Sequence, residues 1–581
     1  MVVAAVTVQG VARGDRIPAS VRADRVREYA LHAIVDESMP EARKDLATYV
    51  REEAARRRIS TLRGRLLERL SVAADSILLI DHWQREMGGN DVAEPVLHWL
   101  VRSNERLALL LNTLSPDDRW PRAMDILSAI HNADPGGRDA YFRLALAIAI
   151  VWDQPRPQPH PQTGSSLLSF DFDPVARFHY FKHLYAEGDA EVRYRNVSIR
   201  DLKFVVCSAV PLSELRWARR NVRGGSRSWD DKYEDVAYNQ GRVVRGEFDW
   251  PHGAYTLESI REHGGICVDQ AYYGAVTARA HGIPAMLFVG QGRRGLHAWF
   301  GYMEREDEWN LEAGRYRYDN YATGVAVEPQ LNRSMSDHDL EYFRDRGLRS
   351  PAAREAARLV RLGAVLRQLG EMQKAYECGA RARKIVPRYD PAWALQEALL
   401  MKADSRQALE ECVELLDSKA TNFRRYPDFV ARIRQRQADL LQQLGRNDDA
   451  ERILRVNQSR LARDRDDLGR FLGIEQIKAV LQRGDTHEAR DIFEDVLKDH
   501  RHEGMKAVQL VRAYLNLTRE TGQTEEAVDF LRRYLPRMHR RSNGESLHGP
   551  VFLELLVQAY VNDGDTRGAE RARRRLERAR D

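Results

Sequence analysis

Cysteine is scarce in this sequence of 581 residues, and its four members, Cys207, Cys267, Cys378 and Cys412, lie far apart. Small secreted domains that depend on disulfides carry closely spaced, paired cysteines, so the scatter excludes a disulfide framework. Free thiols in a reducing compartment are expected instead, and a cytoplasmic location is the prediction.

Long apolar runs are also absent from the sequence. A membrane-spanning helix needs about 20 consecutive apolar residues, and no stretch approaches that length, so no membrane span is predicted. The first residues, MVVAAVTVQGVARGDRIPA, contain a short apolar segment with no basic residues before it, which does not fit a secretory signal. Export of a form whose leader is missing from the numbered chain stays open.

Charge of one sign is not in excess either. The 91 basic and 86 acidic residues leave a net charge of +5, which predicts no nucleic-acid partner. With 43% apolar and 30% charged residues, the composition is that of an ordinary globular protein, and the length predicts two to four domains.

Hydrophobic patterning divides the chain into blocks. Apolar residues at three- and four-residue spacing predict a helical domain over 21–152, after a flexible N-terminus at 1–20. Prolines that alternate with polar residues predict an extended linker at 153–170. The next block, 171–348, mixes helical patterns with the strand-like stretches AMLFVG, HAWFGYM and VAVEP. It is therefore predicted to be an α+β domain.

The last block, 349–581, is helical and repetitive. A frame of one glycine, four mostly polar residues and one alanine recurs roughly every 40 residues, beginning at Gly370, Gly445, Gly484, Gly522 and Gly564, with Ala403 replacing the glycine once. The glycine ends one helix and the alanine lets the next pack closely, so about six helical hairpins are expected to form an α-solenoid. The frame resembles that of tetratricopeptide (TPR) repeats, which implies a protein partner on the array. Because repeat contacts are between neighbours, the array is also expected to fold without the preceding block.

Three features that resemble functional motifs are assigned structural roles. The segment Gly290–Gly295 matches a dinucleotide fingerprint, but a strand pattern follows it where a helix is required, so a turn between strands is predicted. His179 and His183 have the spacing of a metal-binding pair without a third ligand, and are interpreted as packed or surface histidines. Cys207, Cys378 and Cys412 lie in apolar or repeat-helix patterns and are expected to be buried.

Cys267 is different because it follows two glycines at the start of the helical pattern GGICVDQAYYGAVTARAHG. A helix N-terminus is expected to lower the pKa of a thiol, and a thiolate is the nucleophilic form. His297 begins a strand pattern, and a hairpin of this strand with AMLFVG, packed on the cysteine helix, would bring the imidazole to the sulfur. This pair predicts a nucleophile and its base.

The surrounding residues carry a resemblance to a known family. GGICVDQA, then RAHGIPAMLFVGQG, HAWFGYM and a tryptophan-led EWNLEAGRY, resemble the transglutaminase-like (papain-like) cysteine enzyme superfamily over about 255–330, in its bacterial type with C-terminal TPR-like repeats. The resemblance implies that Cys267 is the nucleophile and His297 the general base. It also implies an acidic residue that orients the histidine.

The acidic residue does not match the family pattern, which places an aspartate about four residues after the tryptophan. Glu312, three residues after Trp309, is the prediction, while Asp319 and Asn310 stay open. The backbone N–H of Cys267 is one expected oxyanion donor, with Gln240 or Trp250 as the other.

Taken together, the sequence predicts a multidomain, mainly α chain with a central papain-like or transglutaminase-like α+β domain and a TPR-like α-solenoid. The expected activity is thiol-dependent acyl transfer on amide bonds of a protein or peptide, as a peptidase or amidase with water, or a transglutaminase with an amine. The expected catalytic residues are Cys267, His297 and Glu312, and the scheme calls for no metal, calcium or organic cofactor. The alternative is a non-catalytic scaffold with a degenerate central domain.

Overall fold

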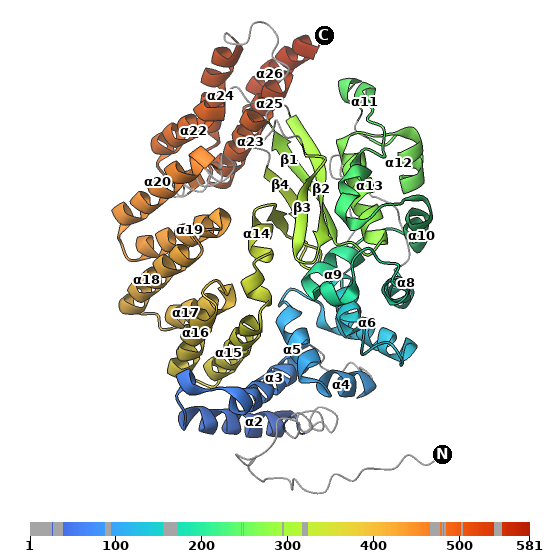
Figure 1. Cartoon of the computed structure of the whole chain (residues 1–581). Coiled ribbons are helices and arrows are strands. Elements are labelled where there is room, and N and C mark those ends of the chain that lie inside the picture. Colours follow the sequence, from blue (N-terminus) through green and yellow to red (C-terminus); the bar gives the residue numbers. More distant parts are fainter. Residues whose placement is uncertain are drawn as a thin grey trace.

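The structure is a computed structural model in which 26, 29, 39–86, 94–154, 172–245, 247, 249–292, 295–315, 323–464, 477–478, 480–481, 484–500, 504–539 and 549–580 are described. The predicted flexible N-terminus and nearly all of the predicted linker lie outside these residues. In Figure 1 the N-terminal helices lie at the base and the sheet stands above them near the middle, with helices of the central block on its right and the C-terminal helices curving along the left.

The N-terminal block is helical, as predicted. Its described elements are α2 (Met39–Ala55), η1 (Ile59–Thr61), α3 (Gly64–Glu86), α4 (Glu94–Val101), α5 (Asn104–Thr113), α6 (Trp120–Ala133) and α7 (Phe142–Val151). Helices α4 and α5 are separate, because Ser103 caps α5 by accepting a hydrogen bond from the Arg106 N–H at 3.3 Å.

The central block combines helices with one sheet. Its helices are α8 (Pro174–Ala186), η2 (Tyr194–Asn196), α9 (Ile199–Val206), α10 (Leu212–Asn221), η3 (Ser226–Tyr233), α11 (Gln240–Arg245), α12 (Leu257–His263), α13 (Cys267–Ala280), α14 (Asp339–Phe343) and η4 (Arg346–Arg349). Its strands are β1 (Ala285–Gly292), β2 (Gly295–Arg305), β3 (Glu308–Ala313), β4 (Thr323–Val327) and β5 (Ser334–Ser336). They pair antiparallel in the order β3-β2-β1-β4-β5.

Helix α13 is the core helix of this block. All of its residues are buried, and it packs on β1 and β2. Gly274 makes the packing close, because a Cβ at this position would overlap the ring of Phe300 on β2. The predicted hairpin of AMLFVG with HAWFGYM is confirmed as β1–β2, with Gly290 opposite His297. The first three residues of VAVEP are confirmed as strand, because β4 ends at Val327.

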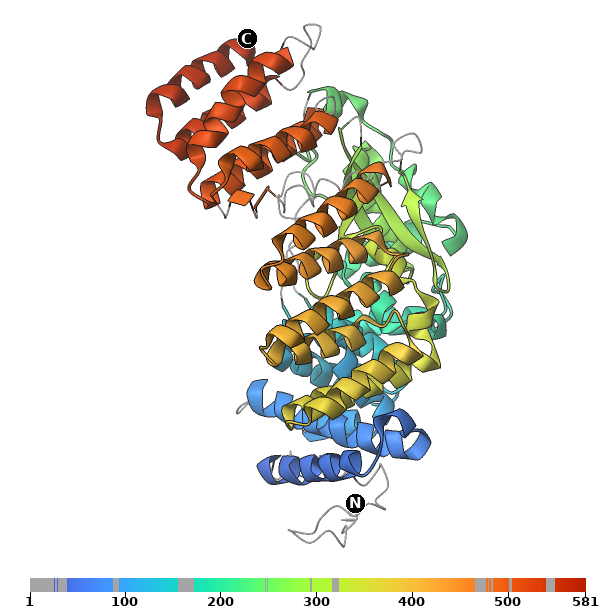
Figure 2. The same cartoon turned by 90° about the vertical axis from the view of Figure 1, so that its left-hand side faces the viewer.

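The C-terminal block is a helical array, as predicted. Its described helices are α15 (Pro351–Gln368), α16 (Met372–Ile385), α17 (Asp390–Lys402), α18 (Arg406–Asn422), α19 (Pro427–Gln443), α20 (Asn447–Asp464), α22 (Thr486–His500), α23 (Gly504–Glu520), α24 (Thr524–His539), α25 (Gly549–Asp563) and α26 (Thr566–Arg580). A further helical stretch at 477–481, described in part, precedes α22. Figure 2 shows these helices stacked in pairs, with the last pairs standing away from the sheet.

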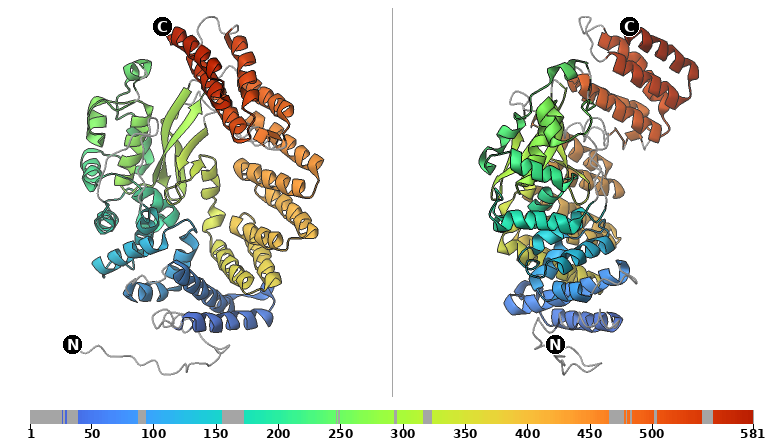
Figure 3. Two further views of the ribbon diagram at one scale, coloured as in Figure 1. Left: turned by 180° about the vertical axis from the view of Figure 1, so that it is seen from behind. Right: turned by 90° about the vertical axis from the view of Figure 1, so that its right-hand side faces the viewer.

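The array does not begin as a separate unit, contrary to the expectation that its contacts are only between neighbouring repeats. One hydrophobic core continues from the N-terminal helices through the central block into α15, α16 and α17. Arg361 of α15 is buried and donates from Nε to Asp75 Oδ1 of α3 at 2.6 Å. In the view from behind, the first array helices adjoin the N-terminal helices (Figure 3). The first hairpin is therefore stabilised by α3 as well as by the next repeat.

Candidate active site around Cys267 and His297

The turn before Cys267 is held by main-chain contacts from the segment that precedes α11. Gly264 has φ +72°, and a Cβ there would meet the carbonyl of Ala237. Gly265 donates its N–H to Ala237 O at 2.9 Å and accepts from the Asn239 N–H at 2.7 Å. The two glycines are thus required by the shape of the turn, and Cys267 follows as the first residue of α13.

A buried ion pair lies behind the same turn. Asp269 is fully buried, and its Oδ2 accepts from the Ile266 N–H at 2.8 Å and from Arg242 Nη1 at 3.0 Å. Its Oδ1 accepts from the Tyr255 hydroxyl at 2.8 Å. The carboxylate therefore caps α13 and has its charge balanced by Arg242, so that the first turn of the helix is fixed.

The sulfur of Cys267 lies at the edge of β2, beyond the end of β3. Strand β3 ends at Ala313, which lies opposite Phe300 of β2. Ala298 lies two residues before Phe300 on the same edge of β2, beyond the end of β3. The Ala298 N–H faces the Cys267 sulfur and acts to lower the pKa of the thiol. The Tyr233 hydroxyl lies 2.9 Å from Ala298 O and 3.4 Å from Cys267 O. Cys267 is thereby tied to the residue that follows His297.

The environment of the thiol differs from the expectation. Burial raises the pKa of Cys267, while the main-chain N–H groups of Ala298 and Val268 lower it in part. The prediction that the helix N-terminus lowers the pKa of this thiol is wrong in its net direction, because the cost of burying a thiolate outweighs the N–H groups that face it.

His297 is buried on β2 and has a defined orientation. Its ring stacks near Trp299 with centroids 5.9 Å apart and meets the ring of Tyr233 edge-on at 6.5 Å. Its Nε2 lies 2.7 Å from Gly314 O. Because a carbonyl can only accept, Nε2 carries the hydrogen, and the neutral ring has its basic lone pair on Nδ1.

The conformation of Gly314 lets its carbonyl reach His297. Its φ is +82°, and a Cβ there would overlap the ring of Tyr233. A residue with a side chain could not turn its carbonyl toward His297 without moving that ring.

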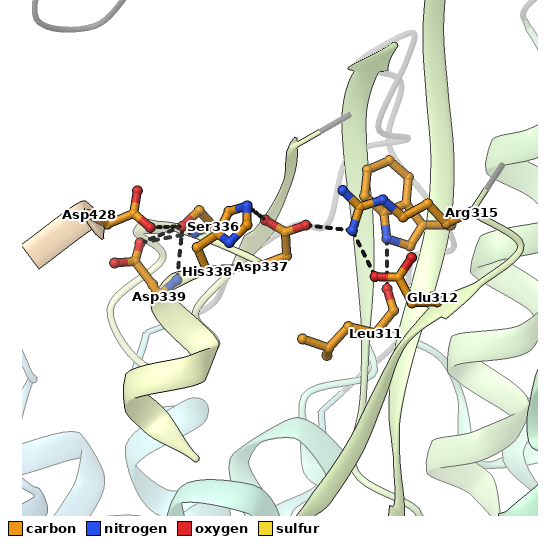
Figure 4. Close-up of polar contacts among 9 residues, drawn as sticks. Leu311, Glu312, Arg315, Ser336, Asp337, His338, Asp339 and Asp428 are labelled. Carbon is orange, nitrogen blue, oxygen red and sulfur yellow. Dashed lines mark hydrogen bonds and ion pairs between the residues drawn. The ribbon is translucent and has the colours of Figure 1, made fainter. Parts of the chain in front are cut away.

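The predicted role of Glu312 is not what the structure shows. Its side chain is 64% exposed, and Oε1 lies 2.9 Å from Arg315 Nη1, at the surface of the strand end (Figure 4). The reason is the irregular register of β2 with β3, which turns the chain after Ala313 and brings the Gly314 carbonyl, rather than the carboxylate, to the imidazole.

The two alternatives for the acid have different outcomes. Asn310 is engaged elsewhere, since Oδ1 accepts from the Glu312 N–H at 2.9 Å and Nδ2 lies 3.4 Å from the Tyr302 hydroxyl. Asp319 lies outside the described residues.

Sequence reasoning missed Tyr233 and Gly314. Tyr233 has no signal, because it lies far before Cys267 in a 3-10 helix and reaches the site only through the packing of η3 on α13 and β2. Gly314 had one signal: a glycine directly after a strand pattern indicates a turn in which a carbonyl is redirected.

Gln240 and Trp250, the two alternatives for the second oxyanion donor, differ in their surroundings. Gln240 is exposed at the start of α11. The indole N–H of Trp250 is buried without an acceptor among the described residues, and its ring packs near Arg242 and Tyr255. Of these two residues, Trp250 is therefore the one whose buried N–H is available to donate a hydrogen bond.

The remaining candidates have the structural roles assigned to them. Gly290 and Gly292 belong to β1 and Gly295 begins β2. The segment that matches the dinucleotide fingerprint therefore forms part of a β-hairpin. His179 and His183 lie exposed on α8. The other three cysteines are buried thiols. In the part of the chain that the structure describes, there is no cluster of three or more metal-ligating side chains, and no helix is long and apolar enough to cross a bilayer.

Comparisons with known proteins give no family. No protein-family model matches the chain, and no curated protein matches it significantly. Similar solved structures include the human IFIT1 dimer with PPP-AAAA, at 11% identity over 96% of this chain and 93% of that chain, with a TM-score of 0.21. The human IFIT1 dimer with m7Gppp-AAAA has 11% identity over 97% of this chain and 91% of that chain, with a TM-score of 0.20. Scores this low do not establish a shared fold, so the function has to be inferred from the site.

Proposed function

We propose that this protein is a transglutaminase-like cysteine enzyme that transfers acyl groups from amide bonds of a protein or peptide substrate. The observation that supports this best is the position of Cys267. It begins a buried helix with its sulfur against the main chain next to His297, whose Nε2–H is fixed by a 2.7 Å hydrogen bond to Gly314 O. A nucleophile, a base and an orienting group are the parts that acyl transfer needs.

The raised pKa of the thiol determines how the first step proceeds. Since burial favours the neutral thiol over the thiolate, the proton of Cys267 passes to Nδ1 of His297 as the sulfur attacks the amide carbon. The imidazolium then gives that proton to the leaving amine, the C–N bond breaks, and a thioester remains.

In the second step His297 takes a proton from the acyl acceptor, which attacks the thioester carbon. The C–S bond breaks and the thiol is restored. Water as acceptor gives a peptidase or amidase, and a lysine amine gives a cross-link. The backbone N–H of Cys267 and the indole N–H of Trp250 are the groups proposed to stabilise the oxyanion. This scheme needs no metal or organic cofactor.

A non-catalytic scaffold is the second candidate, and two observations favour it. Burial raises the pKa of Cys267, and Glu312, the predicted orienting acid, is 64% exposed and pairs with Arg315. The helical array would then supply the function by binding a protein partner. The α18–α19 region of the array packs against the central block, since Tyr342 of α14 contacts Phe423, Tyr426 and Phe429. A partner is therefore assigned to the later repeats.

Alkylation of the full-length protein by iodoacetamide at pH 7.5 distinguishes the two candidates. All four cysteines are buried, so burial alone predicts equal protection, and the other three thiols are internal controls. We expect Cys267 to react at least about tenfold faster than the others, and His297→Ala to remove this advantage. Equal labelling of all four thiols in the folded protein would favour the scaffold.

A further inference from the structure

The last helix of the array, α26, carries arginines along one face. On the opposite face Ala569 and Ala572 are buried, where the helix packs on α25. Exposed arginines occur at i, i+4, i+7 and i+11, at Arg567, Arg571, Arg574 and Arg578. Because a helix has 3.6 residues per turn, this spacing places the four side chains in one row about 16 Å long. These four residues are called the arginine stripe.

The positive charge of the stripe is almost uncompensated within the chain. In the part of the chain that the structure describes, Arg567, Arg574 and Arg578 form no ion pair. Arg571 has one contact, at 3.9 Å from Asp565, and its side chain is 62% exposed. A pair this long and this exposed is screened by water and contributes little. The stripe is therefore a row of cations that face solvent.

Earlier helices of the array balance their arginines with acids. In α18, Arg406 lies 3.2 Å from Glu410, and Arg436 of α19 lies 2.9 Å from Glu397 of α17. A terminal repeat requires a polar outer face for solubility, and side chains of both signs satisfy that requirement. The single sign of the stripe therefore indicates a binding surface for an anionic partner.

The residues of α26 select among anionic partners. Guanidinium groups bind carboxylates and phosphates in a bidentate manner, so both kinds of anion fit the arginines themselves. However, α26 contains no aromatic residue on which the bases of a single-stranded nucleic acid could stack. Its buried alanines face α25, so no apolar face is left to enter a bilayer. Glu570 and Glu577 are exposed along one flank, which disfavours a wide anionic surface such as a duplex. A narrow acidic segment of a protein is the partner that fits.

We propose that the arginine stripe of α26 binds an acidic segment of a partner protein. A helix with carboxylates at i, i+4, i+7 and i+11 presents a row of matching length and spacing. The last hairpin, α25 with α26, stands away from the sheet (Figure 2), so such a segment can approach it from solvent. The inference rests on the part of the proposed function that assigns a partner to the later repeats, and it does not depend on the chemistry of Cys267.

The test measures binding of the full-length protein to a labelled, alanine-based helical peptide with glutamates in this row. Fluorescence anisotropy at low ionic strength gives the dissociation constant. A second peptide has the same composition with its glutamates spread around the helix, and it is expected to bind several-fold more weakly. Arg574→Gln with Arg578→Gln is expected to weaken binding of the first peptide by about tenfold, because two exposed charge pairs are lost.

The matched control is Arg573→Gln with Arg575→Gln, which removes the same charge from the same helix outside the stripe. All four arginines are exposed, so both double variants are expected to fold as the unmodified protein does. The control should bind the aligned peptide within about twofold of the unmodified protein. In addition, Arg574→Glu with Arg578→Glu is expected to lose the glutamate peptide and to bind its lysine counterpart.

Four outcomes overturn the proposal. Absence of binding to the aligned peptide, or equal losses in the two glutamine variants, would show that the stripe is not a specific site. Tighter stripe-dependent binding of a single-stranded RNA or of anionic lipid vesicles would assign it to phosphate. Stripe-dependent self-association would assign it to a second copy of the chain. Cys267→Ala should bind the peptide as the unmodified protein does, so slow Cys267 alkylation contradicts the proposed activity and leaves this inference standing.

Discussion

Gly314 illustrates how one residue without a side chain can determine the geometry of a site. Its carbonyl accepts from His297 because the backbone at φ +82° reverses there, and the ring of Tyr233 covers the position that a Cβ would take. Both conditions exclude other residues, since the left-handed region favours glycine and the ring leaves no space. The orientation of His297 therefore depends on a glycine at this position.

Gly314→Ala is predicted to lower the free energy of unfolding by about 2–4 kcal/mol, through backbone strain and overlap with Tyr233. It should also slow Cys267 alkylation by about tenfold, because the hydrogen bond to His297 is displaced. Urea denaturation and peptide mapping measure the two effects.

Gly445→Ala is the control for this prediction. Gly445 has φ +76°, and nothing lies within 4 Å of the place its Cβ would take, so strain alone of about 1–2 kcal/mol is expected. Its Cys267 should react as in the unmodified protein. If the two variants have the same alkylation rate, the carbonyl of Gly314 does not orient His297.

At the scale of elements, the recurring Gly-x4-Ala frame corresponds to one structural unit. Gly370, Gly445, Gly484, Gly522 and Gly564 all have φ between +73° and +85°. The alanines that close the frames are buried where the second helix of each hairpin packs on the first, at Ala375, Ala408, Ala450, Ala489, Ala527 and Ala569. In the one frame without a glycine, Asp404 adopts φ +42° directly after Ala403. The conformation, rather than the residue type, is what repeats.

A substitution series at Gly370 tests this interpretation. The Cβ position there is open, so only the backbone conformation at φ +84° is probed. Gly370→Asn is predicted to cost a few tenths of a kcal/mol, because asparagine enters the left-handed region readily, and Gly370→Val roughly 1–2 kcal/mol. Equal losses in urea denaturation would show that the glycine is not needed for its conformation.

At the scale of the whole molecule, buried polar groups join the blocks. Besides Arg361 and Asp75, the contact between the α5–α6 turn and the central block contains Asp118. Its Oδ2 accepts from the Ser115 N–H at 2.7 Å and from Gln330 Nε2 at 2.8 Å. Burial raises the pKa of Asp118 to about 6, with a smaller rise from Asp153 and an opposing effect of Lys203.

This pKa predicts a pH-dependent stability. The folded-state pKa of Asp118 is raised from 3.8 to about 6, so the stabilisation from its neutral form is complete below the unfolded value and is lost as the pH rises through about 6. Asp118→Asn keeps a neutral group there at every pH. The variant should exceed the unmodified protein in free energy of unfolding by about 1–2 kcal/mol at pH 7.5 and match it near pH 4.

Asp117→Asn is the matched control, because Asp117 is exposed and pairs with Arg333 at the surface. It should change the free energy of unfolding by less than about 0.5 kcal/mol at either pH. Urea denaturation of both variants at pH 4 and 7.5 makes the comparison. A pH-independent difference for Asp118→Asn would mean that this carboxyl does not titrate in the folded range.

What the sequence determined by itself was local. The helix that begins at Cys267, the β1–β2 hairpin that carries His297, and the glycine turns of the array each follow from short-range patterns of glycine, apolar spacing and β-branched or aromatic residues. These patterns act within a few residues, where backbone conformation and one buried face are sufficient to specify an element.

What only the tertiary structure decided is how those elements meet. The net direction of the Cys267 pKa depends on how deeply the whole fold buries the sulfur, which no local pattern records. The exposure of Glu312 and the contact of the Gly314 carbonyl with His297 follow from a register shift between β2 and β3. Asp337 reaches Arg315 only because β4 and β5 lie on the same sheet as β3. Burial, register and long-range charge pairing are properties of packed elements, and they appear only when the chain has folded.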